Sequence, residues 1–145
     1  MFMTDKVRIR LAAPLGLIER QAELLRYVLA HDAPQGDDGE LRLRSVERLL
    51  QVALECVADV GNILIDTLMM RDAASYVDIV DILADERVLS PGTALGVRRV
   101  MALRRALMQQ FVEDEVCAEV WECAERWPDL QGFCGEVRAF SQREQ

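Results

Sequence analysis

Residues 41–70 read LRLRSVERLLQVALECVADVGNILIDTLMM. No proline interrupts this stretch, and Gly61 is its only glycine. Polar side chains recur along it in steps of three or four residues, which is the spacing of one face of an α-helix, and leucine, valine and isoleucine fill most other positions. The members of this polar stripe are Glu47, Gln51, Glu55, Asp59, Asn62 and Asp66. The stretch therefore predicts one long helix with a polar face.

The rest of the chain also has the pattern of helices. Apolar residues repeat at helical spacing from Leu11 to Leu29, with Pro14 near the start. Ser75 followed by Asp78 has the spacing of a capping box, and Ser90-Pro91 is an N-cap followed by proline at the first helical position. Further helices are predicted to start near these caps, with the helix from 91 ending at about 111–113, and two more at 115–126 and 129–140.

Composition agrees with an all-α fold. Hydrophobic residues make up 51% of the 145 residues but aromatic residues only 6%, which is typical of a helical bundle. We expect a single domain over residues 1–145, folded as an up-and-down helical bundle.

Charge and cysteine content exclude several classes of protein. The net charge of −8 argues against a nucleic-acid binder that uses its whole surface, although arginines cluster locally at 98–105 and 42–48. The four cysteines include no CxxC pair, which predicts reduced thiols in the cytoplasm and no zinc site. No segment approaches the roughly 18 uncharged apolar residues of a membrane span. We expect a cytoplasmic protein with no metal and, because there is no glycine-rich phosphate loop, no nucleotide cofactor.

Arg104 stands out because it interrupts the apolar stripe of its helix. At about 100° per residue, Val97, Val100, Met101 and Leu107 fall within about 60° of it. A guanidinium in such a place needs a carboxylate or a polar network to receive its charge. It is either a structural arginine that pairs with an acid on a neighbouring helix, with Glu55 and Asp59 as candidates, or an anion-binding or catalytic group.

Two runs carry a resemblance to a known family. Residues 45–62 (SVERLLQVALECVADVGN) look like the second helix of HepT-like proteins of the HEPN superfamily, and residues 75–83 (SYVDIVDIL) resemble their short third helix. The resemblance covers about residues 5–120. It implies a four-helix core there, with the helices of residues 121–143 as a C-terminal extension. It also implies a homodimeric, metal-independent ribonuclease toxin whose partner is a minimal nucleotidyltransferase antitoxin.

The catalytic signature of the family matches this chain only in part. Active members carry an arginine with a polar residue after it, and then a histidine and a tyrosine. Here the arginine is Arg104, the polar position is Arg105, the histidine position is Gln109 and the tyrosine position is Phe111. An amide cannot exchange a proton near neutral pH as an imidazole does, and a phenyl ring offers no hydroxyl for adenylylation. The signature therefore predicts weak or lost ribonuclease activity, and both residues could equally be ordinary helix residues.

Three classes of function stay open at this point. The first is a divergent ribonuclease in which Arg104 binds the scissile phosphate with Arg98 and Arg105, while Glu55, Asp59 and Asn62 line the same cleft. The second is a catalytically silent domain that binds a nucleotidyltransferase partner or RNA. The third is a purely structural helical dimer. Tyr76 begins an apolar stripe, which favours a packing role for it.

Overall fold

The computed structural model describes residues 3–31, 36–108 and 114–143. Within these ranges the chain is built of helices and contains no strand, which confirms the all-α prediction. The helices are α1 (Asp5–Leu29), α2 (Asp37–Thr67), α3 (Tyr76–Asp85), α4 (Pro91–Ala102), α5 (Arg104–Met108), α6 (Asp114–Ala124) and α7 (Trp127–Arg143).

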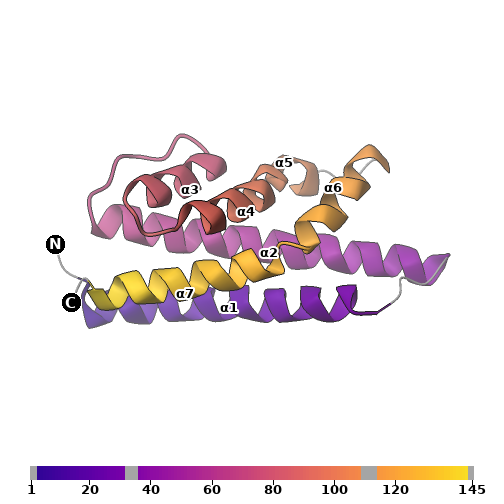
Figure 1. Cartoon of the computed structure of the whole chain (residues 1–145), viewed down its shortest axis with the longest axis horizontal. Coiled ribbons are helices and arrows are strands. Elements are labelled where there is room, and N and C mark those ends of the chain that lie inside the picture. Colours follow the sequence, from indigo (N-terminus) through magenta and orange to yellow (C-terminus); the bar gives the residue numbers. More distant parts are fainter. Residues whose placement is uncertain (1–2, 32–35, 109–113, 144–145) are drawn as a thin grey trace.

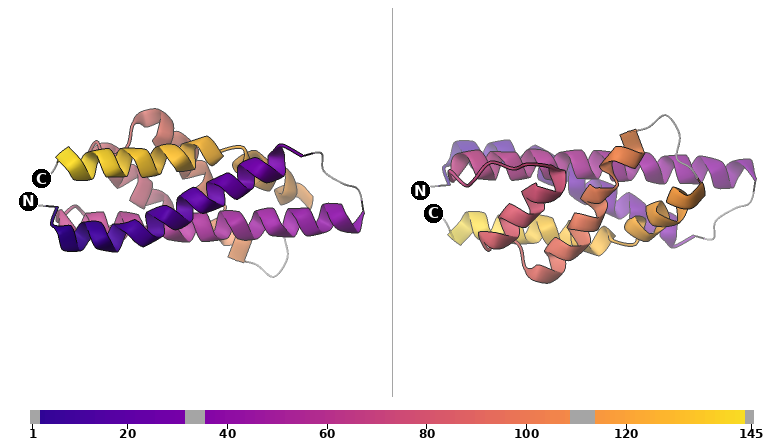
Figure 2. Two further views of the ribbon diagram at one scale, coloured as in Figure 1. Left: turned by 90° about the horizontal axis from the view of Figure 1, so that it is seen from below. Right: turned by 90° about the horizontal axis from the view of Figure 1, so that it is seen from above.

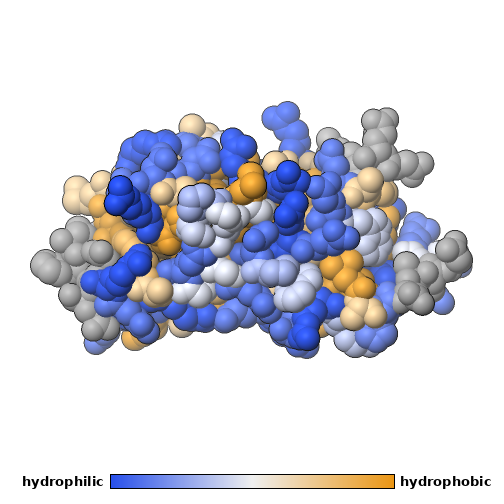
Figure 3. Space-filling view, in the orientation of Figure 1, coloured by the Kyte–Doolittle hydropathy of each residue, from blue (hydrophilic) through white to orange (hydrophobic). Residues whose placement is uncertain are grey.

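The helices form an elongated bundle along the axis of α2. α1 and α2 run antiparallel as a long hairpin, and α7 lies beside α1, so that the start of α1 and the end of α7 meet at one end of the molecule (Figure 1). α3 and α4 cover another side of α2, and α4 also contacts α7 (Figure 2). Polar side chains dominate the face shown in Figure 3, with smaller apolar areas between them. No helix in the described ranges combines the length and apolar character that crossing a membrane requires.

One apolar cluster holds the bundle together. Its fully buried side chains come from α1, α2, α3, α4, α6 and α7, and the largest are Phe133, Ile18, Leu25, Leu50, Leu54, Leu64, Ile82, Leu83, Met101 and Leu130. Each such side chain contributes about 1.5–3 kcal/mol by leaving water. Since Leu130 and Phe133 belong to α7, this C-terminal helix packs into the same core as the preceding helices.

Local signals in the sequence set several helix starts. The Ser90 hydroxyl accepts a hydrogen bond from the amide of Thr93 at 3.4 Å, and Pro91 occupies the first turn of α4, as predicted. The predicted span of α2 is wrong by several residues, because the helix begins at Asp37 and ends at Thr67. Met69 adopts a left-handed conformation with φ 53°, and this turn ends the helix before Met70.

The prediction of one continuous helix through Arg104 is also wrong. α4 ends at Ala102, and the amide of Leu103 donates to the carbonyl of Val100 at 3.1 Å, a tightened turn of the 3₁₀ type. Arg104 then begins the separate short helix α5. The interruption means that the helical-wheel position of Arg104 relative to α4 does not decide where its side chain points.

Candidate functional site

Arg104 forms an ion pair with Glu55 across two helices. Its Nε donates to Oε1 of Glu55 at 3.2 Å, so the predicted pairing with the polar stripe of α2 is present for this residue. Both side chains are 38% exposed. The arginine is therefore not the buried charge that the apolar stripe suggested, and a ligand in solution can reach the pair.

Tyr76 completes the cluster from the first turn of α3. Its hydroxyl donates to Oε2 of Glu55 at 2.8 Å, and the guanidinium carbon of Arg104 lies 4.0 Å from the centre of its ring. The interpretation of Tyr76 as a packing residue was incomplete, because the ring packs against the core while the hydroxyl joins the polar network. A tyrosine that lies partly buried usually finds a polar partner for its hydroxyl, and this was the signal available in the sequence. We call Arg104, Glu55 and Tyr76 the arginine cluster.

The register of α5 on α2 positions the guanidinium. One turn beyond Arg104, the Sδ atom of Met108 accepts a hydrogen bond from the Gln51 side chain at 3.2 Å, and Gln51 lies one turn before Glu55. Two contacts separated by one turn on both helices show that α5 crosses this part of α2 in the antiparallel sense. The position of Arg104 is thus fixed by a second contact of α5 with α2 as well as by its own side chain.

Gly61 lets α3 approach α2 closely enough to bring Tyr76 to the cluster. A Cβ atom at position 61 would overlap Cγ2 of Ile79, and it would lie 3.7 Å from the nearest side-chain atom of Leu83. Ile79 is one turn after Tyr76 on α3. The absence of a side chain at this one glycine therefore decides how near the phenol of Tyr76 comes to Glu55.

The electrostatics of the arginine cluster raise the pKa values of two of its members, Tyr76 and Arg104. Burial raises the pKa of Tyr76, and the bond to Glu55 raises it further, so the phenol stays protonated and donates. Burial lowers the pKa of Arg104, but its contacts with Glu55 and Tyr76 outweigh this, and the net pKa lies above its ordinary value. The cluster thus presents a permanent cation beside a carboxylate.

The other predicted site residues lie apart from this cluster. Nε of Arg98 contacts Oδ1 of Asp81 on α3 at 3.1 Å, and Arg105 is exposed. Asp59 and Asn62 border a shallow hollow between α1 and α2, so the prediction that they share the cleft of Arg104 does not match their surroundings. Gln109 and Phe111 lie outside the described residues.

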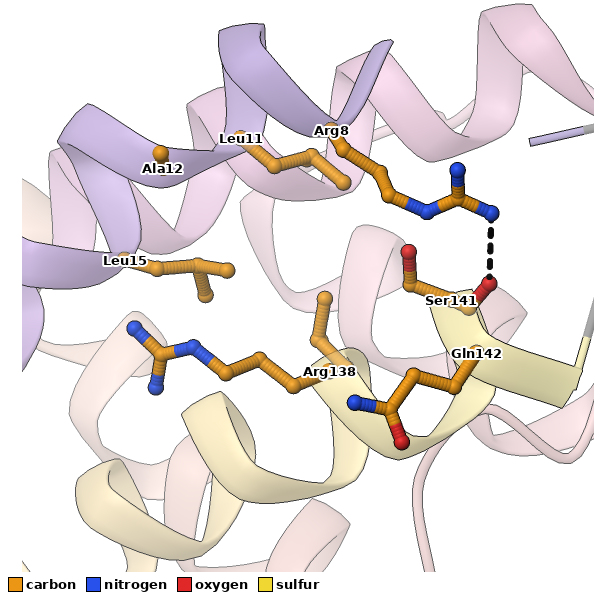
Figure 4. Close-up of a pocket in the computed structure, with 8 residues that line it drawn as sticks. Arg8, Leu11, Ala12, Leu15, Arg138, Ser141 and Gln142 are labelled. Atoms are coloured by element: carbon orange, nitrogen blue, oxygen red, sulfur yellow. Dashed lines mark hydrogen bonds between the residues drawn. The ribbon is translucent and has the colours of Figure 1, made fainter. Parts of the chain in front are cut away.

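A second hollow, of about 220 Å³, lies between α1 and α7 (Figure 4). Leu11, Leu15 and Val137 form its apolar wall, and Nη2 of Arg8 donates to the carbonyl oxygen of Ser141 at its edge, at 3.3 Å. α1 and α7 contribute no residue to the arginine cluster. This hollow is therefore separate from the candidate site.

A family model described as "Ribonuclease HepT-like" matches residues 17–137. The chain belongs to the HepT-like ribonuclease family. The matched region contains every member of the arginine cluster, so the family resemblance seen in the sequence is confirmed over the whole of the candidate site.

One relative of known sequence and one solved structure are similar to this HepT-like chain over most of its length. It is 36% identical over 112 residues to a Bacillus subtilis (strain 168) protein named "Putative RNase YutE", a match that covers 77% of this chain and 72% of that protein. The structure of YutE from Bacillus subtilis, described as a cytosolic protein of unknown function, superimposes with a TM-score of 0.80 at 29% identity and covers 99% of this chain and 95% of that chain.

The second solved structure shares the fold alone. It is described as a toxin-antitoxin with AMP-PNP, and it superimposes with a TM-score of 0.70 at 17% identity, covering 89% of this chain and 97% of that chain.

Proposed function

We propose that this HepT-like protein binds RNA at the arginine cluster and cleaves it weakly, without a metal ion. The observation that carries the proposal is the half-exposed guanidinium of Arg104, which is held by Glu55 on one edge and stacked on Tyr76. A guanidinium has five N–H donors in a fixed fork, which suits a phosphate. Because Arg104 bonds Glu55 through Nε, its two terminal nitrogens are the part of the fork that a phosphate would meet.

The negative net charge of the chain means that RNA can bind only where arginines gather. The chain carries a net charge of −8, so phosphate affinity must come from local arginines. Arg105 follows Arg104 and is exposed, and Arg48 lies two turns before Glu55 on the same face of α2. Arg98 is less available because it pairs with Asp81. We propose Arg104, Arg105 and Arg48 as the phosphate contacts.

The weakness of the proposed cleavage follows from the signature positions. Gln109 replaces the family histidine and cannot move a proton near neutral pH, and Phe111 offers no hydroxyl. A site that keeps electrostatic stabilisation but lacks the positioned imidazole of active members loses part of the factor of about 10² to 10⁴ that general acid–base catalysis contributes to the rate. Both residues occupy positions of the family signature in the sequence, and on this ground we retain them as members of the proposed site.

The experiment that tests this proposal compares three forms of the protein on a mixed RNA substrate in the presence of a chelator. We expect slow cleavage by the unmodified protein, none by Arg104→Ala, and faster cleavage by Gln109→His. Equal cleavage by the unmodified protein and Arg104→Ala would refute a role for Arg104. Cleavage by Gln109→His alone would mean that the unmodified protein binds RNA and does not cut it.

The alternative function is a non-catalytic helical homodimer that binds RNA or a nucleotidyltransferase of the antitoxin type. Ile9 and Leu17 on α1 are 74% and 48% exposed, and in this alternative they would be covered by the protein partner. Failure of all three forms to cut RNA would favour this alternative. A cytoplasmic location belongs to either proposal, because the cysteines are free thiols and the YutE structure is described as cytosolic.

A further inference from the structure

RNA cleavage at the arginine cluster needs a group that accepts the proton of the attacking ribose hydroxyl. Neither the amide of Gln109 nor the ring of Phe111 can do so. Within the part of the chain that the structure describes, the carboxylate of Glu55 is the proton acceptor in direct contact with Arg104. It lies beside the guanidinium that would hold the phosphate, which is where a base for the adjacent hydroxyl has to be.

The carboxylate of Glu55 is held by its neighbours and still has room for a substrate. Oε1 accepts from Nε of Arg104 at 3.2 Å, and Oε2 accepts from the Tyr76 hydroxyl at 2.8 Å. An ionised carboxylate offers about four acceptor positions, two on each oxygen. These two bonds use one position on each oxygen, and 38% of the side chain is open to solvent. A third hydrogen bond, from a ribose hydroxyl, can therefore form.

We propose that Glu55 is the general base of this site and that Tyr76 is the positioning residue that holds its carboxylate. The inference rests on the proposed ribonuclease function. In the step, Glu55 takes the proton of the ribose 2′-hydroxyl as that oxygen forms a bond to phosphorus. The bond from phosphorus to the 5′ oxygen breaks with its electron pair, and the 5′ oxygen takes a proton from water. The products are a 2′,3′-cyclic phosphate and a 5′-hydroxyl, and Glu55 releases its proton to solvent.

The matched pair of variants that tests Glu55 is Glu55→Gln and Asp66→Asn. Glutamine keeps the size of the side chain and one acceptor oxygen, which can accept from Arg104, while its NH2 group can donate to the Tyr76 oxygen, but it cannot take up the proton. Asp66 is exposed on the same helix, so Asp66→Asn makes the same change in charge away from the cluster. We expect Glu55→Gln to lower the cleavage rate by about 10² to 10⁴ and Asp66→Asn to leave it within about twofold.

Measurements of RNA binding distinguish two roles for Glu55, a general base and a negative charge that only changes the affinity for RNA. Removing a carboxylate beside Arg104 reduces local repulsion of phosphate, so Glu55→Gln is expected to bind RNA as tightly as the unmodified protein or more tightly. A general base then shows as lost cleavage with binding retained. The acidic limb of the pH–rate profile of the unmodified protein should also be missing from the residual activity of Glu55→Gln.

Tyr76→Phe tests the positioning residue. It keeps the ring beside Arg104 and removes the hydroxyl, which donates to Glu55 and also interacts with Arg104. One such hydrogen bond corresponds to about a threefold to tenfold change, so we expect kcat to fall by that factor while KM changes by less than about twofold. An unchanged kcat in this variant would overturn the role of Tyr76.

The experiments distinguish failure of the role of Glu55 from failure of the proposed ribonuclease function. Cleavage by Glu55→Gln at the unmodified rate, with Arg104→Ala inactive, would overturn the role of Glu55 and leave the ribonuclease proposal intact. An unmodified protein that binds RNA but never cuts it would overturn both the ribonuclease and its base. Lost binding together with lost cleavage in Glu55→Gln would show that the carboxylate organises Arg104 and does not act as the base.

Discussion

Replacing Gly61 with alanine tests the close packing that brings Tyr76 to the arginine cluster. The added Cβ would overlap Cγ2 of Ile79, which is 3% exposed, so Ile79 can move away only by displacing the side chains packed around it. Inserting a methyl group into a packed core costs about 1–3 kcal/mol. Replacing glycine with alanine inside a helix raises the free energy of unfolding by about 0.5–1 kcal/mol. The net expectation is a loss of about 0 to 2.5 kcal/mol in the free energy of unfolding.

Gly16→Ala is the matched control for this prediction. Gly16 lies within α1, and a Cβ there would meet nothing within 4 Å. Only the helix-propensity gain remains, so Gly16→Ala should stabilise the protein by about 0.5–1 kcal/mol. The difference between the two variants then isolates the overpacking, about 1–3 kcal/mol. Urea denaturation followed by circular dichroism measures both.

The overlap between the added Cβ at position 61 and Ile79 can also be removed by shortening Ile79. Ile79→Ala deletes the overlapping methyl group, so the penalty of Gly61→Ala should disappear in that background, a coupling that a double-mutant cycle reports. If Gly61→Ala stabilises the protein as much as Gly16→Ala does, the contact between α2 and α3 is not as close as the structure has it, and the placement of Tyr76 loses its support.

Two further predictions concern titratable groups. A hydrogen bond from Arg71 holds the pKa of Asp78 at about 2, below its ordinary value of 3.8, so its stabilising effect is complete above pH 3.8 and is lost as the pH falls toward 2. Thermal melting of Asp78→Asn should therefore show lower stability at pH 7 and a weaker loss between pH 4 and pH 2; an identical pH dependence would contradict this. Burial raises the pKa of Cys56, that of Cys123 to about 11 and that of Cys134 to about 12, whereas Cys117 is half-buried. At pH 8 a disulfide reagent should modify one thiol quickly, and Cys117→Ser should abolish this fast phase; a fast phase that survives would show that a buried thiol is reactive.

Local signals in the sequence predicted the all-helical fold and two members of the arginine cluster, Arg104 and Glu55, but not the end of α2 or the break between α4 and α5. The Ser90 cap and the apolar periodicity act over a few residues, so they predicted where helices form without knowledge of the fold. The polar stripe of α2 and the unusual place of Arg104 predicted that a carboxylate would receive the guanidinium. The end of α2 was misplaced because the left-handed turn at Met69 has no glycine to mark it.

The hydrogen bond of Tyr76 could not be predicted from the pattern of residues near it in the sequence. Its hydrogen bond to Glu55 joins residues 21 positions apart, and it depends on the approach that Gly61 permits. The hydrophobic stripe that follows Tyr76 favours packing, which is true of the ring but says nothing of the hydroxyl.

The sequence by itself determined that this chain is a bundle of helices and that Glu55 lies on a polar face. It also indicated a carboxylate of that face as a partner for Arg104, although Arg104 is 38% exposed and not buried as its apolar stripe suggested. Only the tertiary structure decided that the partner is Glu55 and not Asp59, since the two lie one turn apart on the same stripe. The choice depends on the break at Leu103 and on the register of α5 against α2, across 49 residues of sequence. Periodicity and caps depend on neighbours within a few residues, whereas this register follows from how whole helices pack.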